Sequence, residues 1–178
     1  DDSINMIGYV ESKKETLRGN HYHPIQTQKC LLIKGCYISI TKDLSNINSV
    51  VETRLIKEGD LSTIPPYVAH TMVFLEDSVF LNLVNGEREH KNYGITHTIP
   101  FKLVDQKLFD NLIESYVTKC RVCGKGLNHY LSLGLSPLAN NLNKEKEASN
   151  DLYPLDLNFC KECANSQLSV VVPPKKMF

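Results

Sequence analysis

The sequence predicts a mainly β fold over its first 104 residues, followed by one helix and a small module built around four cysteines. Three observations support this prediction. Short apolar runs recur between turn signals from Lys29 to Val84, as in all-β sandwiches and barrels. Apolar residues between Asp105 and Tyr116 then follow a helical spacing. Two Cys-x-x-Cys pairs come last, and paired cysteines of this kind are typical of a metal site.

The apolar runs are the predicted strands, at residues 30–33, 37–41, 50–56, 61–64, 72–75 and 79–84. Within the second run, Cys36, Ile38 and Ile40 alternate with more polar neighbours, which predicts a strand with one buried face. The polar stretch 43–49 is its predicted hairpin loop.

Phe109, Leu112 and Ile113 fall on one helical face behind Asp105, a good N-cap residue. This predicts one helix between the β-rich part and the cysteine-rich part. We expect a β-barrel at 1–104, a linker helix at 105–118 and a zinc-binding module at 119–178. The stretch 140–151 is predicted to be a solvated loop of that module.

The chain has 178 residues, with 20 Lys and Arg against 20 Asp and Glu, and its pI is about 7.1. This balance argues against a nucleic-acid-binding or anionic-membrane surface. No apolar run approaches the length of a membrane helix, and residues 1–14 lack the regions of a signal peptide. We therefore expect a cytoplasmic protein with no nucleic acid or membrane partner. Because it begins with Asp, we expect a piece of a longer polypeptide.

Six cysteines divide into two kinds. Cys30 and Cys36 are isolated in apolar surroundings and are predicted to be small buried hydrophobes. The other four form the two pairs, Cys120 with Cys123 and Cys160 with Cys163. These four are predicted to hold a structural zinc in a closed four-thiolate shell. The alternative is redox chemistry. Gly124 after the first pair can adopt a positive φ. Ala164 stands at the matching place, which predicts a less regular second turn.

Three histidines are candidates for a site inside the barrel. His21 and His23 are two residues apart, so a strand sends both side chains to one face. With His70 they offer three imidazoles, which suit zinc, nickel, iron or copper, and the amide oxygen of Gln28 can complete the shell. The alternative is a cluster of hydrogen-bonded histidines without metal.

The segments that carry these residues, RGNHYHPIQTQKCLLIKG and GDLSTIPPYVAH, resemble the two motifs of the cupin superfamily. The resemblance implies a cupin jelly-roll barrel. The sequence departs from the motifs where Gln28 replaces a glutamate and where Tyr67 replaces a glycine. Losing the carboxylate weakens metal binding but sharpens the pull of a bound ion on a carbonyl or anionic oxygen.

The RGNHYH opening is most similar to cupins of nucleotide-sugar metabolism, which implies a nucleotide-sugar substrate and isomerisation or epimerisation of a 4-keto sugar. A histidine on a metal cannot also act as a base. With metal bound, the candidate bases are therefore Tyr22 and Tyr67; without it, the three histidines themselves. The candidates for binding the diphosphate of the substrate are Arg18, Lys29, Arg88 and Lys91. The alternative for each is an ordinary solvated charge. The cupin resemblance also implies a homodimer through the barrels.

The segments CRVCGKGLNHYLSLGLSPLANNL and YPLDLNFCKECANSQLSVVVPPKKMF are similar to the zinc-binding domain at the start of nucleotide-sugar C-methyltransferases, including a turn at residues 132–134. This resemblance implies deoxysugar or polysaccharide biosynthesis and a following methyltransferase domain that binds S-adenosylmethionine (SAM). No glycine-rich loop is left here for SAM, so this chain alone is not expected to transfer a methyl group. The alternative is a non-catalytic sugar-binding cupin whose zinc module is an interaction platform.

Overall fold

The computed structural model describes residues 3–85, 98–139 and 151–177. The chain divides into two compact units. The first comprises Asp1–Val50 and Leu55–Leu103, and the second comprises Val51–Arg54 and Val104–Phe178. The helix expected as a linker is part of the second unit in this division.

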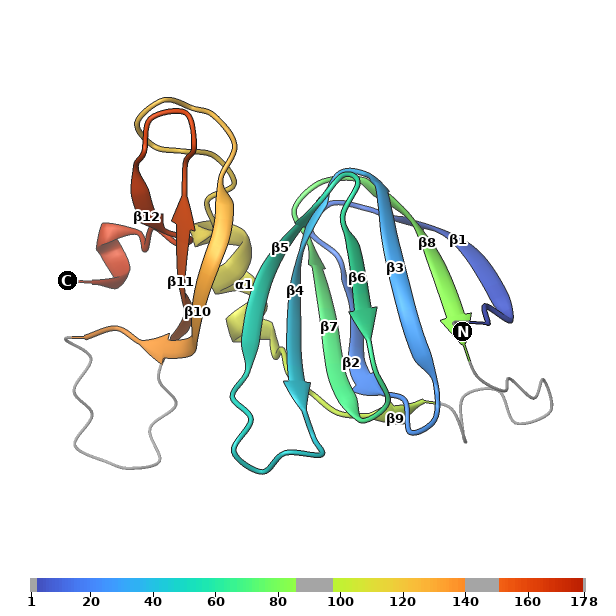
Figure 1. Ribbon diagram of the computed structural model, residues 1–178. Helices are drawn as coiled ribbons and strands as arrows, with labels where there is room; N and C mark the ends of the chain where they lie inside the picture. The colour runs from blue at the N-terminus through green and yellow to red at the C-terminus, as the bar shows by residue number, and fades with distance from the viewer. Residues whose placement is uncertain (1–2, 86–97, 140–150, 178) are drawn as a thin grey trace. The chain divides into compact units, whose positions relative to one another are not determined.

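The first unit is built from two β-sheets (Figure 1). One sheet has the order β1-β8-β3-β6 and the other has the order β5-β4-β7-β2-β9. Their bounds are β1 Met6–Ser12, β2 Leu17–Tyr22, β3 Thr27–Lys34, β4 Cys36–Asp43, β5 Glu52–Lys57, β6 Leu61–Ile64, β7 Val68–Phe74, β8 Ser78–Asn85 and β9 Ile99–Pro100. Along the chain the first eight strands cross from one sheet to the other at every step except from β4 to β5, which are neighbours in one sheet. This is the order of a double Greek key, the jelly roll. The predicted fold class is confirmed.

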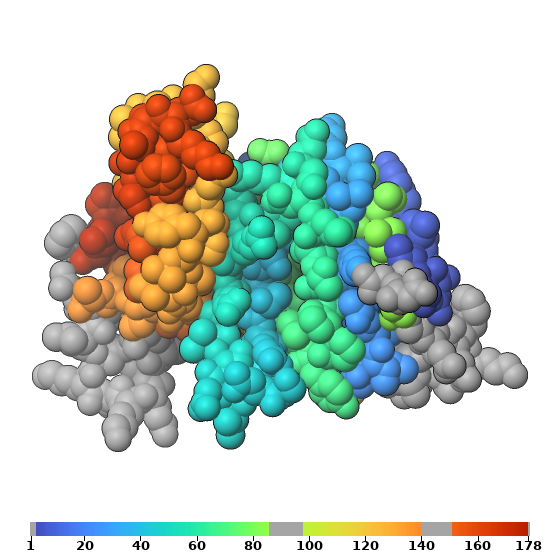
Figure 2. Space-filling model, viewed as in Figure 1, coloured from blue at the N-terminus to red at the C-terminus, as the bar shows by residue number. Residues whose placement is uncertain are grey.

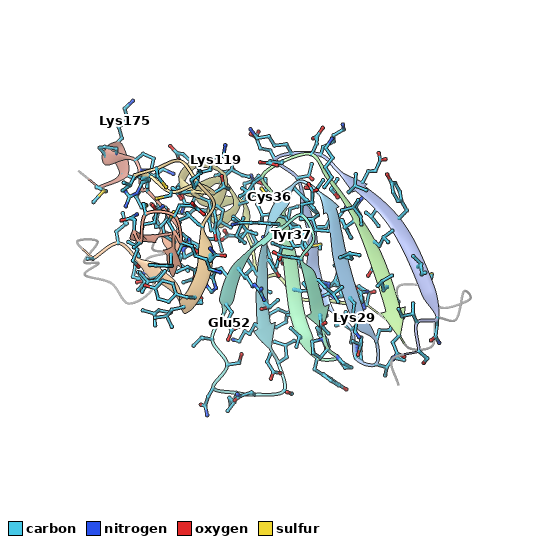
Figure 3. All side chains as sticks on the ribbon, turned by 45° about the horizontal axis from the view of Figure 1, so that its top comes forward. Lys29, Cys36, Tyr37, Glu52, Lys119 and Lys175 are labelled. Atoms are coloured by element: carbon cyan, nitrogen blue, oxygen red, sulfur yellow. The ribbon has the colours of Figure 1, made fainter. Side chains whose placement is uncertain are left out.

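Apolar side chains from both sheets meet in the core of this unit. The buried cluster contains Cys30, Leu32, Tyr37, Ile56, Met72, Phe74 and Phe80. Tyr37, labelled in Figure 3, is fully buried, and its ring centroid lies 5.4 Å from that of Phe74. The prediction that β4 buries only one face is therefore wrong, because Ile38 on the opposite face is fully buried too. Burial raises the pKa of both Cys30 and Cys36 to about 12, as fits their predicted role as inert core residues.

The second unit contains the predicted helix, α1 (Gln106–Ser115). Its N-cap is Asp105, whose Oδ1 accepts a hydrogen bond from the N–H of Leu108 at 2.8 Å. The buried residues of α1 are Leu108, Asn111, Leu112 and Ser115. Of the predicted apolar face only Leu112 is buried, whereas Phe109 and Ile113 are half-buried, so the buried face is turned by about one residue from the predicted one. Beside the helix lie an antiparallel sheet of β10 (Asn128–Pro137), β11 (Leu152–Phe159) and β12 (Ser166–Leu168), and a short 3-10 helix, η2 (Pro174–Lys176).

Residues 132–134 do not form a turn: they lie inside β10, where the pairing with β11 shifts register between Ser132 and Leu135, and Gly134 has φ +82°. They form a β-bulge, so the turn that the family resemblance implied is wrong. The predicted loop at 140–151 lies, apart from Asp151, outside the described residues. Within the described residues, no helix has the length and apolarity to cross a membrane.

Candidate functional site

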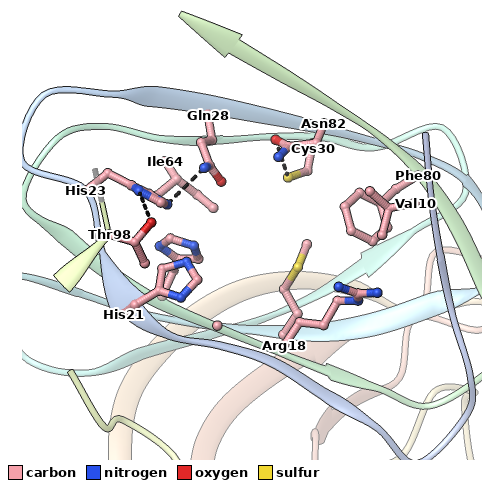
Figure 4. A pocket seen from close by; sticks show the side chains of 13 residues that line it. Val10, Arg18, His21, His23, Gln28, Cys30, Ile64, Phe80, Asn82 and Thr98 are labelled. Atoms are coloured by element: carbon pink, nitrogen blue, oxygen red, sulfur yellow. Dashed lines mark hydrogen bonds between the residues drawn. The ribbon is translucent and has the colours of Figure 1, made fainter. Parts of the chain in front are cut away.

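Three histidines meet in one cavity of the first unit (Figure 4). His21 on β2 is the direct cross-strand partner of His70 on β7, and His23 follows the end of β2. The ring centroids lie 4.6 Å apart for His21 and His70, 4.9 Å for His21 and His23, and 5.3 Å for His23 and His70. One ring nitrogen from each lies within 4.8 Å of the others.

A bulge in β2 places His21 opposite His70. The register shifts between Gly19 and His21, and both Gly19 and Asn20 have positive φ. A Cβ on Gly19 would lie 2.5 Å from the carbonyl oxygen of His70, so no other residue fits there without displacing backbone. The side-chain oxygen of Asn20, Oδ1, accepts hydrogen bonds from the Thr71 hydroxyl and the Leu103 N–H, both at 2.9 Å. Sequence reasoning gave these two residues no role, although a Gly-Asn pair is a usual signal for such backbone.

The cavity has a volume of about 230 Å³. Its wall is partly polar and partly apolar, formed by Val10, Arg18, Gly19, His21, His23, Gln28, Cys30, Ile64, His70, Met72, Phe80, Asn82 and Thr98. Nε of Arg18 donates to Oγ of Ser12 at 2.7 Å, and Nη2 donates to the Glu11 carbonyl at 3.3 Å. These bonds fix the positively charged guanidinium of Arg18 in the cavity wall. Asn82 and Thr98 were missed by sequence reasoning, because nothing local marks a residue from a distant strand as part of a cavity.

Gln28 and Thr98 contact the two nitrogens of His23. The Gln28 side-chain nitrogen lies 2.9 Å from Nε2, and the Thr98 hydroxyl lies 3.4 Å from Nδ1. An amide nitrogen can only donate, so Nε2 of His23 accepts and the proton of this neutral ring is on Nδ1. In His70, Nδ1 lies 3.3 Å from the Val68 carbonyl, which places the proton on Nδ1 and leaves the lone pair on Nε2.

Two of the imidazoles are poor proton acceptors. Burial, assisted by the neighbouring His23, lowers the pKa of His21 to about 4. Burial and the neighbouring His21 lower the pKa of His70 to about 3. Desolvation disfavours the charged form of a base, so both rings are neutral near pH 7, as a metal ligand or a general base must be.

The donor set can be compared with what a divalent metal needs. Three neutral imidazoles that converge within 4.8 Å fit such an ion by type and position. The Gln28 side chain does not fit as a fourth ligand in its present orientation, because its nitrogen engages the lone pair of His23. Of the four residues expected as ligands, His21 and His70 fit an ion as they stand, whereas the Gln28 side chain occupies the lone pair that His23 would need to bind one.

Three other candidates do not line the cavity: Tyr22, Tyr67 and Lys29. The two tyrosines instead stack on each other, with ring centroids 6.0 Å apart. Tyr67 has φ +60°, a conformation that glycine adopts without steric cost. Arg88 and Lys91 lie outside the described residues.

The second candidate site is a cluster of four cysteines in the second unit. The sulfurs come from two turns and lie within 4.8 Å of one another: Cys120, Cys123, Cys160 and Cys163. Across the cluster, the Cys120 and Cys163 sulfurs are 3.6 Å apart, and those of Cys123 and Cys160 are 3.4 Å apart. Backbone hydrogen bonds, first of all from the N–H of Cys123, lower the pKa of the Cys120 thiol to about 6. A thiolate is the form that zinc binds.

The two cysteine turns have matching backbones. The Cys120 N–H donates to the Lys125 carbonyl and the Cys160 N–H to the Asn165 carbonyl, both at 2.8 Å. Gly124 has φ +72° and Ala164 has φ +56°. The prediction of a less regular second turn is therefore wrong: alanine adopts the same left-handed conformation as glycine.

A buried polar group lies in the sheet of this unit. Asp156 on β11 is fully buried and accepts a hydrogen bond from the Ser132 hydroxyl at 2.7 Å. His129 Nε2 lies 4.0 Å from the Asp156 carboxylate. Burial raises the pKa of Asp156. The sequence gave no reason to pair these residues, since only the β10–β11 register brings them together.

Comparisons with solved structures return proteins that are similar to part of this chain. CapF from Staphylococcus aureus is 17% identical with a TM-score of 0.49, covering 58% of this chain and 30% of its own. The dTDP-4-dehydrorhamnose 3,5-epimerase from Sulfolobus tokodaii is 22% identical with a TM-score of 0.46, covering 51% and 56%. NovW, a 4-keto-6-deoxy sugar epimerase from Streptomyces spheroides, is 13% identical with a TM-score of 0.49, covering 59% and 55%.

This chain therefore spans less than two thirds of each of these structures. No curated protein gives a significant match. The cysteine-rich part does match a family model: residues 120–178 correspond to the domain family Methyltransf_13, described as "Putative zinc binding domain".

Proposed function

We propose that this chain is part of a nucleotide-sugar-modifying enzyme of the sugar C-methyltransferase type. In this proposal the barrel binds a 4-keto sugar nucleotide and moves a proton beside its ketone. The observation that carries the proposal is the convergence of three imidazoles and Arg18 on one cavity. The cupin-like motifs that supply these residues add support.

The size of the cavity suits a sugar ring. Its volume of about 230 Å³ lies below the roughly 300–1,000 Å³ of pockets that enclose a drug-sized ligand. A single pyranose would fill the space, and the nucleoside would remain outside. Arg18 in the wall would hold the phosphate next to the sugar, because a guanidinium forms charge-assisted hydrogen bonds with phosphate oxygens.

The proton transfer would proceed through a histidine. A neutral imidazole removes the proton from the carbon next to the ketone, and the electron pair moves onto the ketone oxygen to give an enolate. Returning the proton to the opposite face of that carbon inverts it, which is epimerisation. Returning it to the former ketone carbon, with proton transfer between the two oxygens, is isomerisation. The negative charge of the bound diphosphate favours the protonated imidazole and so raises its low pKa.

A second arrangement keeps a divalent metal on His21, His23 and His70, favoured by their convergence within 4.8 Å. Such an ion would polarise the sugar ketone as a Lewis acid. The base would then have to come from another side chain. Tyr22 and Tyr67 fit this role poorly, since neither lines the cavity.

In the second unit we propose a structural zinc on the four cysteines, for which the family match and the closed cluster are the support. The unit would position a SAM-dependent methyltransferase domain of the same polypeptide. A reducing, cytoplasmic setting would keep the cysteines from forming disulfides, so that they can bind zinc. Without that domain the chain transfers no methyl group.

The test is solvent-deuterium incorporation into a dTDP-4-keto-6-deoxy sugar, followed by NMR, with the chain and its His70→Ala variant. We expect exchange by the chain and a loss of at least about 100-fold in the variant, the usual contribution of a general acid or base. Ile47→Lys, in an exposed loop, is the control and should exchange normally. Equal rates in chain and variant would instead support a cupin that only binds its sugar.

A further inference from the structure

Arg18 and His21 are three residues apart on β2, yet both side chains line the same cavity (Figure 4). Successive side chains of a regular strand point to opposite faces of its sheet. Two residues separated by three positions should therefore lie on opposite faces. In a regular β2, an inward Arg18 would leave His21 outside the cavity, so the alternation is interrupted between them.

The interruption is Asn20. The pairing of β2 with β7 advances in step up to Gly19 and Thr71, and the next pair is His21 with His70. Asn20 is thus one residue more than β7 matches, which makes it the extra residue of a β-bulge. Such a residue inverts the alternation of all the residues that follow it. If the earlier register continued, Asn20 would stand opposite His70, and His21 would point away from the cavity.

Asn20 is well suited to hold this bulge. Its φ is +57°, a left-handed conformation that asparagine tolerates better than most residues with a Cβ. Its Oδ1 accepts hydrogen bonds from the Thr71 hydroxyl and the Leu103 N–H, both at 2.9 Å. The Asn20 N–H donates to Oγ1 of Thr71 at 3.1 Å, and the Asn20 carbonyl accepts from the Phe101 N–H at 2.8 Å. The extra residue is therefore attached to β7 on one side and to the residues after β9 on the other.

The side chain of Asn20 contributes more than its backbone could alone. Thr71 is fully buried, so without Oδ1 its hydroxyl would lose an acceptor where water does not replace it. The Leu103 N–H would lose its acceptor as well. A regular strand needs none of these bonds and would then compete with the bulge.

We propose that Asn20 is the positioning residue that brings Arg18 and His21 to one cavity. The inference rests on the proposed function, in which Arg18 holds the phosphate and the imidazoles move the proton. The Asn20 side chain bonds to Thr71, and neither residue lines the cavity, so Asn20 acts through the backbone of β2. Arg18 precedes the bulge and His21 follows it. Loss of the bulge would therefore misplace the imidazole relative to a sugar whose phosphate is still held.

Asn20→Ala tests the proposal in the deuterium-exchange assay. We expect kcat to fall about 10- to 100-fold, since a misplacement of about 1 Å can cost about 100-fold. KM should change little, because Arg18 keeps its place. Asn20→Asp retains an oxygen acceptor and tolerates the left-handed conformation, so it should keep most of the activity. A residue that only stabilised the barrel would change Tm without this split between kcat and KM.

Asn46→Ala is the matched control. The Oδ1 of Asn46 also accepts a backbone N–H, from Asn48 at 3.0 Å, but in the loop between β4 and β5, which appears in cyan at the bottom of Figure 2. This variant should exchange at the rate of the parent chain. If Asn20→Ala does not fold, judged by circular dichroism, Thr71→Val replaces it. That variant removes the hydroxyl, keeps the shape of the side chain and should give the same fall in kcat.

A second readout does not depend on activity. The ring centroids of His21 and His70 lie 4.6 Å apart, close enough for nuclear Overhauser contacts between ring protons. These contacts should disappear in Asn20→Ala and persist in Asn20→Asp. A parent chain without exchange would contradict the proposed function, and the ring contacts would then decide on Asn20 by themselves. Unchanged kcat or retained ring contacts in a folded Asn20→Ala would overturn the positioning role, as would an Asn20→Asp variant no better than Asn20→Ala.

Discussion

The side-chain nitrogen of Gln28 lies 2.9 Å from Nε2 of His23, so an amide donor occupies the lone pair that a metal on this histidine would need. A carboxylate at this position could not donate such a bond. The negative carboxylate would instead attract a divalent cation and add one charged ligand to the site. Glutamine rather than glutamate at position 28 therefore affects both the charge of the site and the availability of His23.

Gln28→Glu should raise the affinity of the cavity for Mn²⁺ at least about tenfold, since changes around a metal site typically alter affinity 10- to 100-fold. Mn²⁺ is the suitable probe because it prefers oxygen and nitrogen ligands, so the cysteine cluster interferes little. Binding is measured by the loss of the free-ion EPR signal and by the rise in Tm.

Two controls accompany this measurement. Gln28→Met removes the amide without adding a charge and should give a smaller gain. Gln28→Glu combined with His70→Ala should lose the gain, because His70 supplies one of the converging nitrogens. Equal Mn²⁺ affinity in the parent chain and Gln28→Glu would show that Gln28 does not limit metal binding.

The stability of the barrel should fall in mild acid. The folded pKa values of about 4 for His21 and about 3 for His70 lie below the ordinary 6.5. Below pH 6.5 the unfolded chain binds protons that the folded chain does not, so the free energy of unfolding decreases as the pH drops toward 4. One pKa unit corresponds to about 1.36 kcal/mol. Solvent screens the partly exposed His21, so we expect a total loss of about 3 kcal/mol.

Urea unfolding between about pH 7.5 and 5, compared with a His21→Gln, His70→Gln double variant, isolates this effect from other titrating groups. The variant should show a flatter dependence, because it lacks the two buried imidazoles. Parallel curves for the two proteins would contradict the assignment.

Much of the barrel was predictable, for a physical reason. Each of the six apolar runs overlaps an observed strand, and 61–64 coincides with β6, because strands that fill a core need apolar side chains wherever the chain passes through it. β1 was missed. Its inward residues include Gly8 and Ser12, and its exposed ones include Ile7 and Tyr9, so it has no plain core pattern.

The site was predictable only where its residues are close in sequence. The spacing of His21 and His23 places both side chains toward one cavity, and the motif added His70. The contacts of Gln28 and Thr98 with His23 depend on how β3 and the residue before β9 pass the cavity. No local pattern encodes such a relationship. Tyr22 and Tyr67 were candidates by chemistry alone, and their stacking on each other is a tertiary feature.

The second unit should depend on zinc. Cys120→Ser removes one thiolate from the four-cysteine cluster and should lower the zinc content by about one ion per chain. A small unit of this kind has little core of its own, so metal loss should also melt it. Elemental analysis and two-dimensional NMR follow the two effects, and signals of the barrel should persist. Cys36→Ser, which changes a buried barrel cysteine, should keep its zinc. Unchanged zinc content in Cys120→Ser would rule out the site.

The two cysteine turns allow a matched pair of backbone substitutions. Ala164 adopts φ +56° where Gly124 adopts φ +72°, and a left-handed conformation costs a residue with a Cβ about 1–2 kcal/mol. Ala164→Gly removes this cost but loses about 0.5–1 kcal/mol through the greater freedom of glycine in the unfolded chain. We expect a net gain of about 0.5–1 kcal/mol in the zinc-bound protein. Gly124→Ala should lose about as much, because a Cβ there meets no atom within 4 Å and backbone strain is its main effect. Thermal unfolding of both variants at saturating zinc measures the two shifts. Shifts of the same sign would mean that the turns, despite their matching hydrogen bonds, do not share one conformation in solution.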